Sequence, residues 1–493
     1  MSLSVRSANQ PRSKMLQRRS LLWRIHFWAA LLSSPFLIAA ILTGLLYTLS
    51  PQIEDYLYRK IDYVTPQGRP RPLDEAIVAA IQVAPNNYEL YSVIAPFTDI
   101  DSVKIAFIPK TQMPSKSVNA SDHASHGASV STPPNPAHPV QNLSAFLRPS
   151  FGLPARSLVI YVDPYNAQVL GQLLQSERFT TWSKKLHSTY LQDGYRWIIE
   201  FAASWTLVML VTGVFLWMPI LKEKHQEHER NSRRRWRYWH ATIGISMSIM
   251  SAAILVTGLT WSKNTGEQIR WARDALDQKS PRIPAHFRSI IPDHNHSGYD
   301  QGHNFNSQTM IPVPTMISWQ QAWQSVKSNA PDIAIELRAP LGQDGFWRAN
   351  HVDKGDPTKR FDMLLDAYSG QPLFYSGWDD QPLFGKATAI GIPFHRGEFG
   401  IWNQILLIAF GISLLFSFVS GWIMYFKRFR VGMPILPQLL PGTWKTISPW
   451  ALLGTICMMI SMPLLAISSL FVVGIEAIVF IRKTYINTSH NIM

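Results

Sequence analysis

The chain has 493 residues, of which 46% are hydrophobic, and it contains several long uncharged apolar runs. These runs indicate that much of the core lies in lipid. The net charge of +14 does not indicate a nucleic-acid partner, because the basic residues cluster beside the apolar runs, where cytoplasmic loops of membrane proteins carry them. The single cysteine, Cys457, excludes a disulfide within one chain, a Cys-ligated iron–sulfur cluster and a Cys-based zinc site. Any bound metal must therefore rely on histidine or carboxylate ligands.

Apolar stretches of about 20 residues are long enough to cross the hydrocarbon core as helices. The sequence predicts five such spans, at 26–49, 186–220, 239–262, 395–426 and 448–481. The most apolar parts of the second and fourth spans begin near residues 195 and 400. Pro449 and Pro463 interrupt the fifth span, so it either crosses once or forms a broken hairpin.

Basic residues predict the orientation of these spans through the positive-inside rule. They crowd the N-terminal segment 1–25 and the loops 221–238 and 427–447, which are therefore expected in the cytoplasm. Segments 50–185 and 263–394 are then expected on the periplasmic side. A short tail, 482–493, follows the last span.

Both external segments are expected to fold in the same order, as a helix followed by a hairpin. In the first, residues 73–81 form an amphipathic helix and residues 157–173 form two strands around a turn. In the second, a helix starts at Ser318 and a hairpin occupies residues 361–375. Two polar stretches with the composition of disordered insertions lie between these elements. They are residues 112–142 and 292–310. Seven further histidines lie in or near these stretches, namely His123, His126, His138, His286, His294, His296 and His303.

Histidines recur at matching positions in two pairs of spans. Each precedes a Thr-Gly or Ser-Gly pair by a fixed interval. The glycine follows by 18 residues in His26/Gly44 and His240/Gly258, and by 26 residues in His187/Gly213 and His395/Gly421. This matched spacing predicts a polytopic α-helical membrane protein with two parallel repeats of helix, external α+β domain and helix, plus a C-terminal membrane helix.

The direction of each span gives its histidine a depth in the membrane. His26 and His240 begin outward-running spans and are expected near the cytoplasmic face, whereas His187 and His395 begin inward-running spans near the periplasmic face. A pseudo-two-fold axis along the membrane normal places His26 opposite His240 and His187 opposite His395. Two facing imidazoles supply the axial ligands of a b-type haem, whose macrocycle supplies the other four. The four histidines therefore predict two b-type haems, and no catalytic residue is identified.

Several residues keep simpler interpretations open. Duplication copies residues whatever their function, and a single interfacial histidine is commonly a hydrogen-bonding group. Zinc or copper would normally add a carboxylate or another histidine nearby, which neither helix pair offers. Arg24, Arg237 and Arg396 could pair with haem propionates, although anchoring at the cytoplasmic face accounts for Arg24 and Arg237. The four glycines are most simply explained by close helix packing.

The sequence resembles the PepSY-associated transmembrane family over roughly residues 15–430. The resemblance lies in helix 73–81 with the motif from Tyr161 to Gly171, in a weaker copy at 365–371, and in the histidine-bearing spans 186–213 and 394–421. That family includes iron-regulated inner-membrane proteins and di-haem ferri-siderophore reductases. The resemblance therefore implies a bacterial inner-membrane location and electron transfer to a periplasmic ferric chelate. The chain differs from one branch of the family in carrying no C-terminal flavin or nicotinamide domain, so the electron donor is expected to be a cytoplasmic protein or a membrane quinol.

Three functions are consistent with these features. The favoured one is haem-mediated transmembrane electron transfer that reduces a ferric siderophore or another ferric chelate in the periplasm for iron acquisition. Whether the chain is itself an enzyme of the ferric reductase type is left open. The alternative is a PepSY-type binding or regulatory membrane protein without redox activity. A transporter is the third, but Glu200 alone gives poor support for an intramembrane carboxylate relay.

Overall fold

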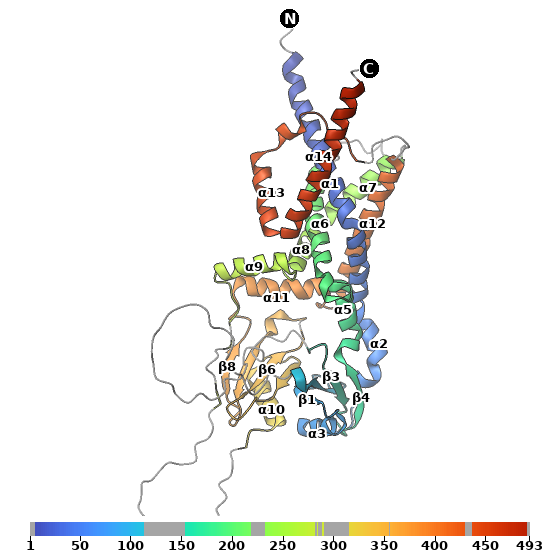
Figure 1. Ribbon diagram of the computed structural model, residues 1–493. Helices are drawn as coiled ribbons and strands as arrows, with labels where there is room; N and C mark the ends of the chain where they lie inside the picture. Colours follow the sequence, from blue (N-terminus) through green and yellow to red (C-terminus); the bar gives the residue numbers. More distant parts are fainter. Residues whose placement is uncertain are drawn as a thin grey trace, which may run out of the picture. The chain divides into compact units, whose positions relative to one another are not determined.

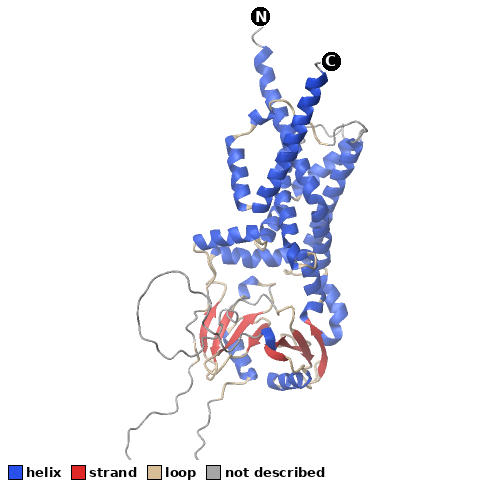
Figure 2. Cartoon of the chain, viewed as in Figure 1, coloured by secondary structure: helices blue, strands red, loops and turns tan. Residues whose placement is uncertain are grey.

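The computed structural model describes residues 5–112, 153–217, 232–281, 283, 288–289, 315–353, 355–428 and 436–490. The insertions predicted at 112–142 and 292–310 lie outside these ranges apart from Gln112, as do the histidines named with them and residues 221–231 of the basic loop. The chain divides into two compact units. We call them the membrane unit (Met1–Pro51, Trp182–Lys279 and Ala387–Met493) and the sheet unit (Gln52–Thr181 and Ser280–Lys386). The strands in Figure 2 all belong to the sheet unit.

Long apolar helices build the membrane unit (Figure 1). Four of them are long and apolar enough to cross a membrane, at Lys14–Thr48, Asp193–Trp217, Ile401–Arg428 and Pro463–Arg482. They belong to α1 (Val5–Thr48), α6 (Arg196–Trp217), α12 (Ile401–Arg428) and α14 (Pro463–His490). The prediction of a multi-pass membrane protein is therefore confirmed.

The predicted third span is a bent pair of helices. It consists of α7 (Ser232–Ser246) and α8 (Ser248–Leu259), which meet at an angle of 56°. The hydroxyls of Ser246 and Ser248 donate hydrogen bonds to the carbonyls of Ile243 and Ile245, three residues back. Such bonds compete with the helical backbone and favour a bend. The pair counts as a fifth span only if the bend is accepted within it.

The predicted fifth span contains two helices. The shorter, α13 (Pro449–Ser461), ends before Pro463, which begins α14. Proline lacks an N–H and disfavours helical backbone in the residue before it, so the helix breaks at Met462. In Figure 1 the chain turns back there, and the N- and C-termini lie at the same end of the membrane unit. Of the two alternatives, the structure has the broken hairpin.

Three shorter helices complete the membrane unit. They are α5 (Phe179–Thr189), α9 (Asn264–Ala275) and α11 (Leu383–Arg396), the first residues of α5 and α11 belonging to the sheet unit. The predicted second and fourth spans thus each begin with a separate helix, α5 before α6 and α11 before α12. His187 lies in α5 and His395 lies in α11.

The two external segments share one antiparallel sheet. Its strand order is β4-β3-β2-β1-β5-β6-β7-β8. From each edge to the centre, the strands of one segment therefore follow in the order fourth, third, second and first. The first segment supplies β1 (Tyr88–Ile94), β2 (Val103–Pro109), β3 (Leu158–Val162) and β4 (Val169–Leu174), and the second supplies β5 (Ile335–Arg338), β6 (Phe346–His351), β7 (Asp362–Asp366) and β8 (Pro372–Ser376). At the centre β1 pairs with β5, with Val93 opposite Leu337. Because this pairing joins the two segments, both must lie on the same side of the membrane.

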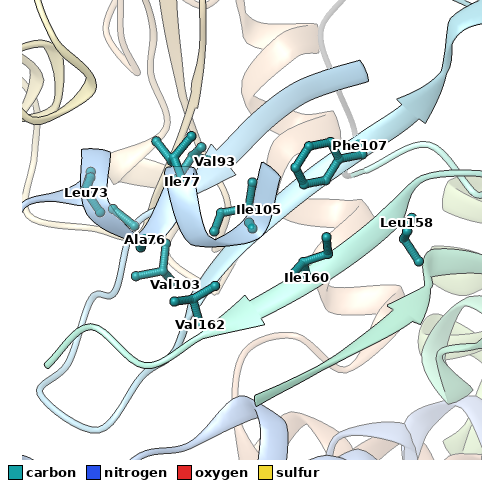
Figure 3. Packing of buried hydrophobic residues seen from close by; sticks show 12 residues of the cluster. Leu73, Ala76, Ile77, Val93, Val103, Ile105, Phe107, Leu158, Ile160 and Val162 are labelled. Carbon is teal, nitrogen blue, oxygen red and sulfur yellow. The ribbon is translucent and has the colours of Figure 1, made fainter. Parts of the chain in front are cut away.

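One helix from each segment covers one face of the sheet. In Figure 3, Leu73, Ala76 and Ile77 of α3 (Leu73–Val83) point onto buried side chains of the first three strands. The second half repeats this packing with α10 (Trp319–Asn329), whose Ala322 and Val326 are fully buried. The first segment also contains α2 (Ser50–Asp62), whose Ile61 packs against strands β3 and β4. Strands β2, β3, β5, β6 and β7 are buried along most of their length, so side chains on both faces of the sheet are covered.

The N-termini of α3 and α10 cap each other. The Asp74 carboxylate accepts hydrogen bonds from the backbone N–H groups of Trp319 (3.0 Å) and Gln320 (3.1 Å). In return, the Gln320 side-chain oxygen accepts from the backbone N–H of Leu73 at 2.9 Å. Helix N-termini leave such N–H groups unsatisfied, so each helix supplies what the other lacks. This exchange ties the two halves of the sheet unit together.

We predict that Asp74→Ala lowers the stability of the sheet unit by about 1–2 kcal/mol, because two N–H groups of α10 lose their acceptor. Asp74→Asn keeps one carbonyl oxygen and should lose roughly half as much. The measurement is thermal unfolding of the full chain in detergent. Equal unfolding temperatures for both variants and the parent would contradict the proposed cap.

Candidate functional site

Each of the four predicted histidines lies against a glycine of a neighbouring helix. A Cβ added at Gly44 would stand 3.2 Å from Cε1 of His187, and one at Gly213 would stand 3.3 Å from Cε1 of His26. In the second half, the corresponding distances are 3.4 Å from Gly258 to His395 and 3.7 Å from Gly421 to His240. The glycines therefore make room for imidazole rings. Their expected role in general helix packing is replaced by this more specific contact.

The hydroxyl residue before each glycine accepts a hydrogen bond from the histidine. Nδ1 of His26 lies 3.1 Å from Oγ1 of Thr212, and Nδ1 of His240 lies 3.0 Å from Oγ of Ser420. Thr43 binds His187 at 3.1 Å and Thr257 binds His395 at 2.9 Å. Every hydroxyl also donates to a backbone carbonyl three or four residues back in its own helix. Since that hydrogen is already used, the hydroxyl oxygen acts as the acceptor.

These contacts fix the tautomer of the imidazoles. Nδ1 of His26 also lies 3.0 Å from the carbonyl oxygen of Met209, and Nδ1 of His240 lies 2.9 Å from that of Ser417. A carbonyl can only accept, so Nδ1 carries the hydrogen. For His187 and His395, the hydroxyls of Thr43 and Thr257 have their own hydrogens bound to carbonyls, so Nδ1 is again the donor. In each ring Nε2 is then the unprotonated nitrogen, which is the form that binds a metal.

The structure brings His26 and His240 together. Their ring centroids lie 6.5 Å apart and the ring planes are perpendicular. A metal–imidazole bond is about 2 Å long, so two such bonds and the radii of two rings account for a separation of this size. The predicted pairing of these residues is therefore present, whereas their role as ligands stays a prediction.

Both rings line a cavity of about 870 Å³. Its wall is mostly apolar and includes Gly213 and Gly421. Arginines from three helices also line it, and they are Arg19 of α1, Arg233, Arg234 and Arg237 of α7, and Arg428 of α12. An apolar cavity with a few convergent polar groups is typical of a cofactor site.

His187 and His395, the residues predicted to form the second pair, bind Thr43 of α1 and Thr257 of α8. Their supporting residues lie at one end of α1 and α8, because Thr43 is near the end of α1 and Thr257 is near the end of α8. His26 and Gly44 are 18 residues apart in α1, which corresponds to about 27 Å at the helical rise. The two pairs therefore occupy different levels of the bundle.

The three arginines considered for propionate binding have different surroundings. Arg24 forms an ion pair with Glu476 of α14 at 2.7 Å, so simple anchoring does not describe it. Arg237 lines the cavity of His26 and His240. Arg396 donates to the Tyr47 hydroxyl at 2.9 Å and pairs with Glu398 at 2.7 Å.

Glu200, considered for a carboxylate relay, caps a helix. It is 1% exposed. Its oxygens accept hydrogen bonds from the backbone N–H and side chain of Asn264 and from the backbone N–H and hydroxyl of Thr265, at the start of α9. These hydrogen bonds hold the start of α9 against α6.

The hydroxyl residues were the functional feature that sequence reasoning missed. Thr43, Thr212, Thr257 and Ser420 precede the four glycines in the sequence. Their repetition before each glycine was a usable indication, because a glycine needed only for packing requires no fixed polar neighbour.

The family comparison agrees with this architecture. The family model described as PepSY-associated TM region matches residues 23–428, which include all four histidines and both halves of the sheet. The chain belongs to the PepSY-associated transmembrane family. No curated protein matches the sequence. The matched PepSY-associated region ends with α12, so the hairpin of α13 and α14 lies beyond it.

We predict opposite effects from alanine at two of the histidine-contacting glycines. Gly421→Ala should be neutral or raise the unfolding temperature, because its Cβ meets His240 at an ordinary 3.7 Å and alanine favours helix by about 0.5–1 kcal/mol. Gly44→Ala should lower it, because its Cβ would be 3.2 Å from His187 and the ring must shift. The measurement is thermal unfolding in detergent, and an equal rise in both variants would show that His187 is not tightly held.

Proposed function

We propose that this protein carries electrons across the membrane through two b-type haems, each held by one histidine pair. The observation that carries the proposal is the His26/His240 pair, whose rings lie 6.5 Å apart inside an apolar cavity. The Nδ1 atoms of both rings are bound to neighbouring helices, so Nε2 is the nitrogen available to iron.

The residues around this pair fit a haem. A flat, largely apolar macrocycle with two propionates suits an apolar cavity that has arginines on part of its wall, because guanidinium groups form charge-assisted bonds with carboxylates. Gly213 and Gly421 leave space beside the rings. When bound, a haem supplies one-electron transfer between ferric and ferrous iron. The protein's own contribution is to hold both ligands in one tautomer and to exclude water from them.

The second pair supports a second haem at the other level. Nδ1 of His187 and Nδ1 of His395 each bind a hydroxyl that precedes a glycine, as the rings of the first pair do. Two parallel repeats, each of a helix, part of the sheet and a further helix, account for this equivalence and for the symmetrical strand order. Two haems at levels about 27 Å apart along α1 would carry electrons across most of a hydrocarbon core about 30 Å thick.

The basic residues support the direction of transfer. Lys14, Arg18, Arg19 and the arginines of α7 are near the His26/His240 level, which we place at the cytoplasmic face of a bacterial inner membrane. The His187/His395 level and the sheet unit are then periplasmic. Electrons from a cytoplasmic protein or a membrane quinol enter at the first pair, and a ferric siderophore or another ferric chelate receives them from the second.

Cations near the second pair suit an anionic chelate. Lys184 lies three residues before His187, and Arg396 directly follows His395. The chain leaves α1 for the sheet unit after Pro51, shortly beyond Gly44.

A second candidate is a binding or regulatory protein without redox activity. It is favoured by membership of the PepSY-associated family and by a sheet unit that has its own apolar core. The absorption spectrum of the purified protein separates the two candidates, since only the first requires haem. Protein prepared with ample haem supply that contains no iron porphyrin would contradict the electron-transfer proposal.

We predict that paired histidine variants remove the haems one at a time. His26→Ala and His240→Ala should lose the same low-spin component, and His187→Ala and His395→Ala should lose the other, leaving about one haem per chain in each case. Combining His26→Ala with His187→Ala should remove both. Haem is quantified after extraction with acidic acetone, which releases it because no covalent attachment motif is present in the sequence. Loss of one common component from His26→Ala and His187→Ala would show that the pairing is wrong.

The side of electron delivery is tested in oriented proteoliposomes. Reduced protein should be reoxidised by a membrane-impermeant ferric chelate added on the side of the sheet unit. The His187→Ala variant provides the matched control, because loss of the second haem should slow this reoxidation. Reoxidation only from the side of the N-terminus would reverse the proposed direction.

A further inference from the structure

The helical hairpin beyond the family-matched region is held to α1 by an ion pair that is largely shielded from solvent. Glu476 of α14 accepts hydrogen bonds from Nε and Nη2 of Arg24, both at 2.7 Å. Its carboxylate also accepts from the Trp28 indole N–H at 2.5 Å. The Arg24 and Glu476 side chains are 7% and 18% exposed. An isolated charge is expensive in lipid, so two such residues in contact constrain how α14 docks.

Arg24 also binds the segment that enters the hairpin. Its Nη1 donates to the carbonyl of Pro437. The following residues continue along α1, with Gln17 donating to the carbonyl of Pro441 at 2.7 Å and Arg18 donating to that of Thr446 at 3.1 Å. In the same segment, Gln438 and Leu440 line the cavity that contains His26 and His240. The Arg24 contacts therefore hold part of the cavity wall in place.

Arg24 and His26 lie on different faces of the same turn of α1. Arg24 and Trp28 are four residues apart and lie on one face of the helix. His26 is two residues from each, which is a rotation of about 200° in an α-helix. The C-terminal hairpin therefore contacts the face of this turn of α1 that is opposite to His26. Apolar contacts of Trp28 and Trp205 with Leu465 and Val472 extend the same interface.

We infer that Glu476 is a positioning residue, which through Arg24 keeps residues 436–440 over the His26/His240 cavity and fixes the turn of α1 that carries His26. This role depends only on the ion pair and the packing contacts, and it does not require haem. The inference rests on the proposed function only in the experiment that measures haem.

A thiol reporter tests the inference without haem. Cys457 is the only cysteine in the sequence, so Cys457→Ser gives a background without thiols. Gly244 lines the cavity, and a Cβ added there would meet no residue of another element within 4 Å. Gly244→Cys therefore places a thiol inside the cavity without displacing a neighbouring side chain. Labelling by a water-soluble maleimide reports how often the cavity wall opens, because modification of a protected site tracks the population of the open state.

Glu476→Gln and Arg24→Gln should each accelerate this labelling by about tenfold or more, because each leaves the partner charge without its counter-ion. The double variant should label more slowly than either single variant, since neither charge is then left alone. Glu200→Gln is the matched control. It removes another buried carboxylate of a membrane span, but one that contacts α9, so the labelling rate should stay at that of the parent.

The haem-loaded protein gives a second readout. Glu476→Gln should shift the midpoint potential of the component that His26→Ala removes and leave the other component unchanged. If Glu476→Gln does not insert into the membrane, Ser468→Ala tests the same interface more gently. It removes the 2.9 Å bond from the Trp205 indole and the hydroxyl's bonds within α14, and it leaves the Arg24–Glu476 ion pair in place. Labelling at the parent rate in these variants would overturn the inference. Accelerated labelling in a protein that contains no haem would uphold it and reject the proposed electron transfer instead.

Discussion

The membrane unit depends on one repeated interaction, the hydrogen bond from a histidine Nδ1 to a hydroxyl that precedes a glycine on the neighbouring helix. The glycine lets the imidazole approach, and the hydroxyl, whose own hydrogen is bound within its helix, can only accept. A larger residue would push the ring away, and a residue without a hydroxyl would leave Nδ1 with the carbonyl alone. The interaction therefore fixes the distance between two helices and the tautomer of the ring together. Its four occurrences leave Nε2 as the unprotonated nitrogen of all four rings.

The sequence predicted that His26 lies opposite His240, because equal spacing within two spans determines equal depth, and their rings lie 6.5 Å apart. The sequence did not predict which neighbouring helix supplies the hydroxyl that binds each ring. His26 contacts Thr212 of α6, which also belongs to the first half of the chain, and the choice between this helix and α12 depends on tertiary packing that periodicity does not encode. The bend at Met247 was missed for a similar reason. Serines at 246 and 248 are compatible with a straight helix until their hydroxyls bind the preceding carbonyls.

In each external segment the helix and the last hairpin were predicted correctly, since capping residues and turn residues are local features, whereas β1, β2, β5 and β6 were not predicted. The pairing of β1 with β5 joins residues more than 200 positions apart, and the sequence contains no comparable local pattern for it. The same limit applies to the reciprocal cap between Asp74 and Gln320. Each residue is an ordinary helix-start residue by itself, and only the meeting of α3 with α10 gives it a distant partner.

The two carboxylates buried in the spans follow one physical rule with different consequences. Glu200 meets the N–H groups and side chains that begin α9, and Glu476 meets Arg24 and Trp28. Each is retained because a lipid-embedded charge needs strong local partners, so each fixes one element at one place. Glu200 thereby attaches α9 to α6, and Glu476 attaches α14 to α1. Of these two helices, α1 is the one that contributes residues to both histidine levels. Because α1 supplies His26 to one pair and Thr43 to the other, and is continuous where α7 and α8 are bent, a contact that holds α1 constrains both sites through a single rigid element.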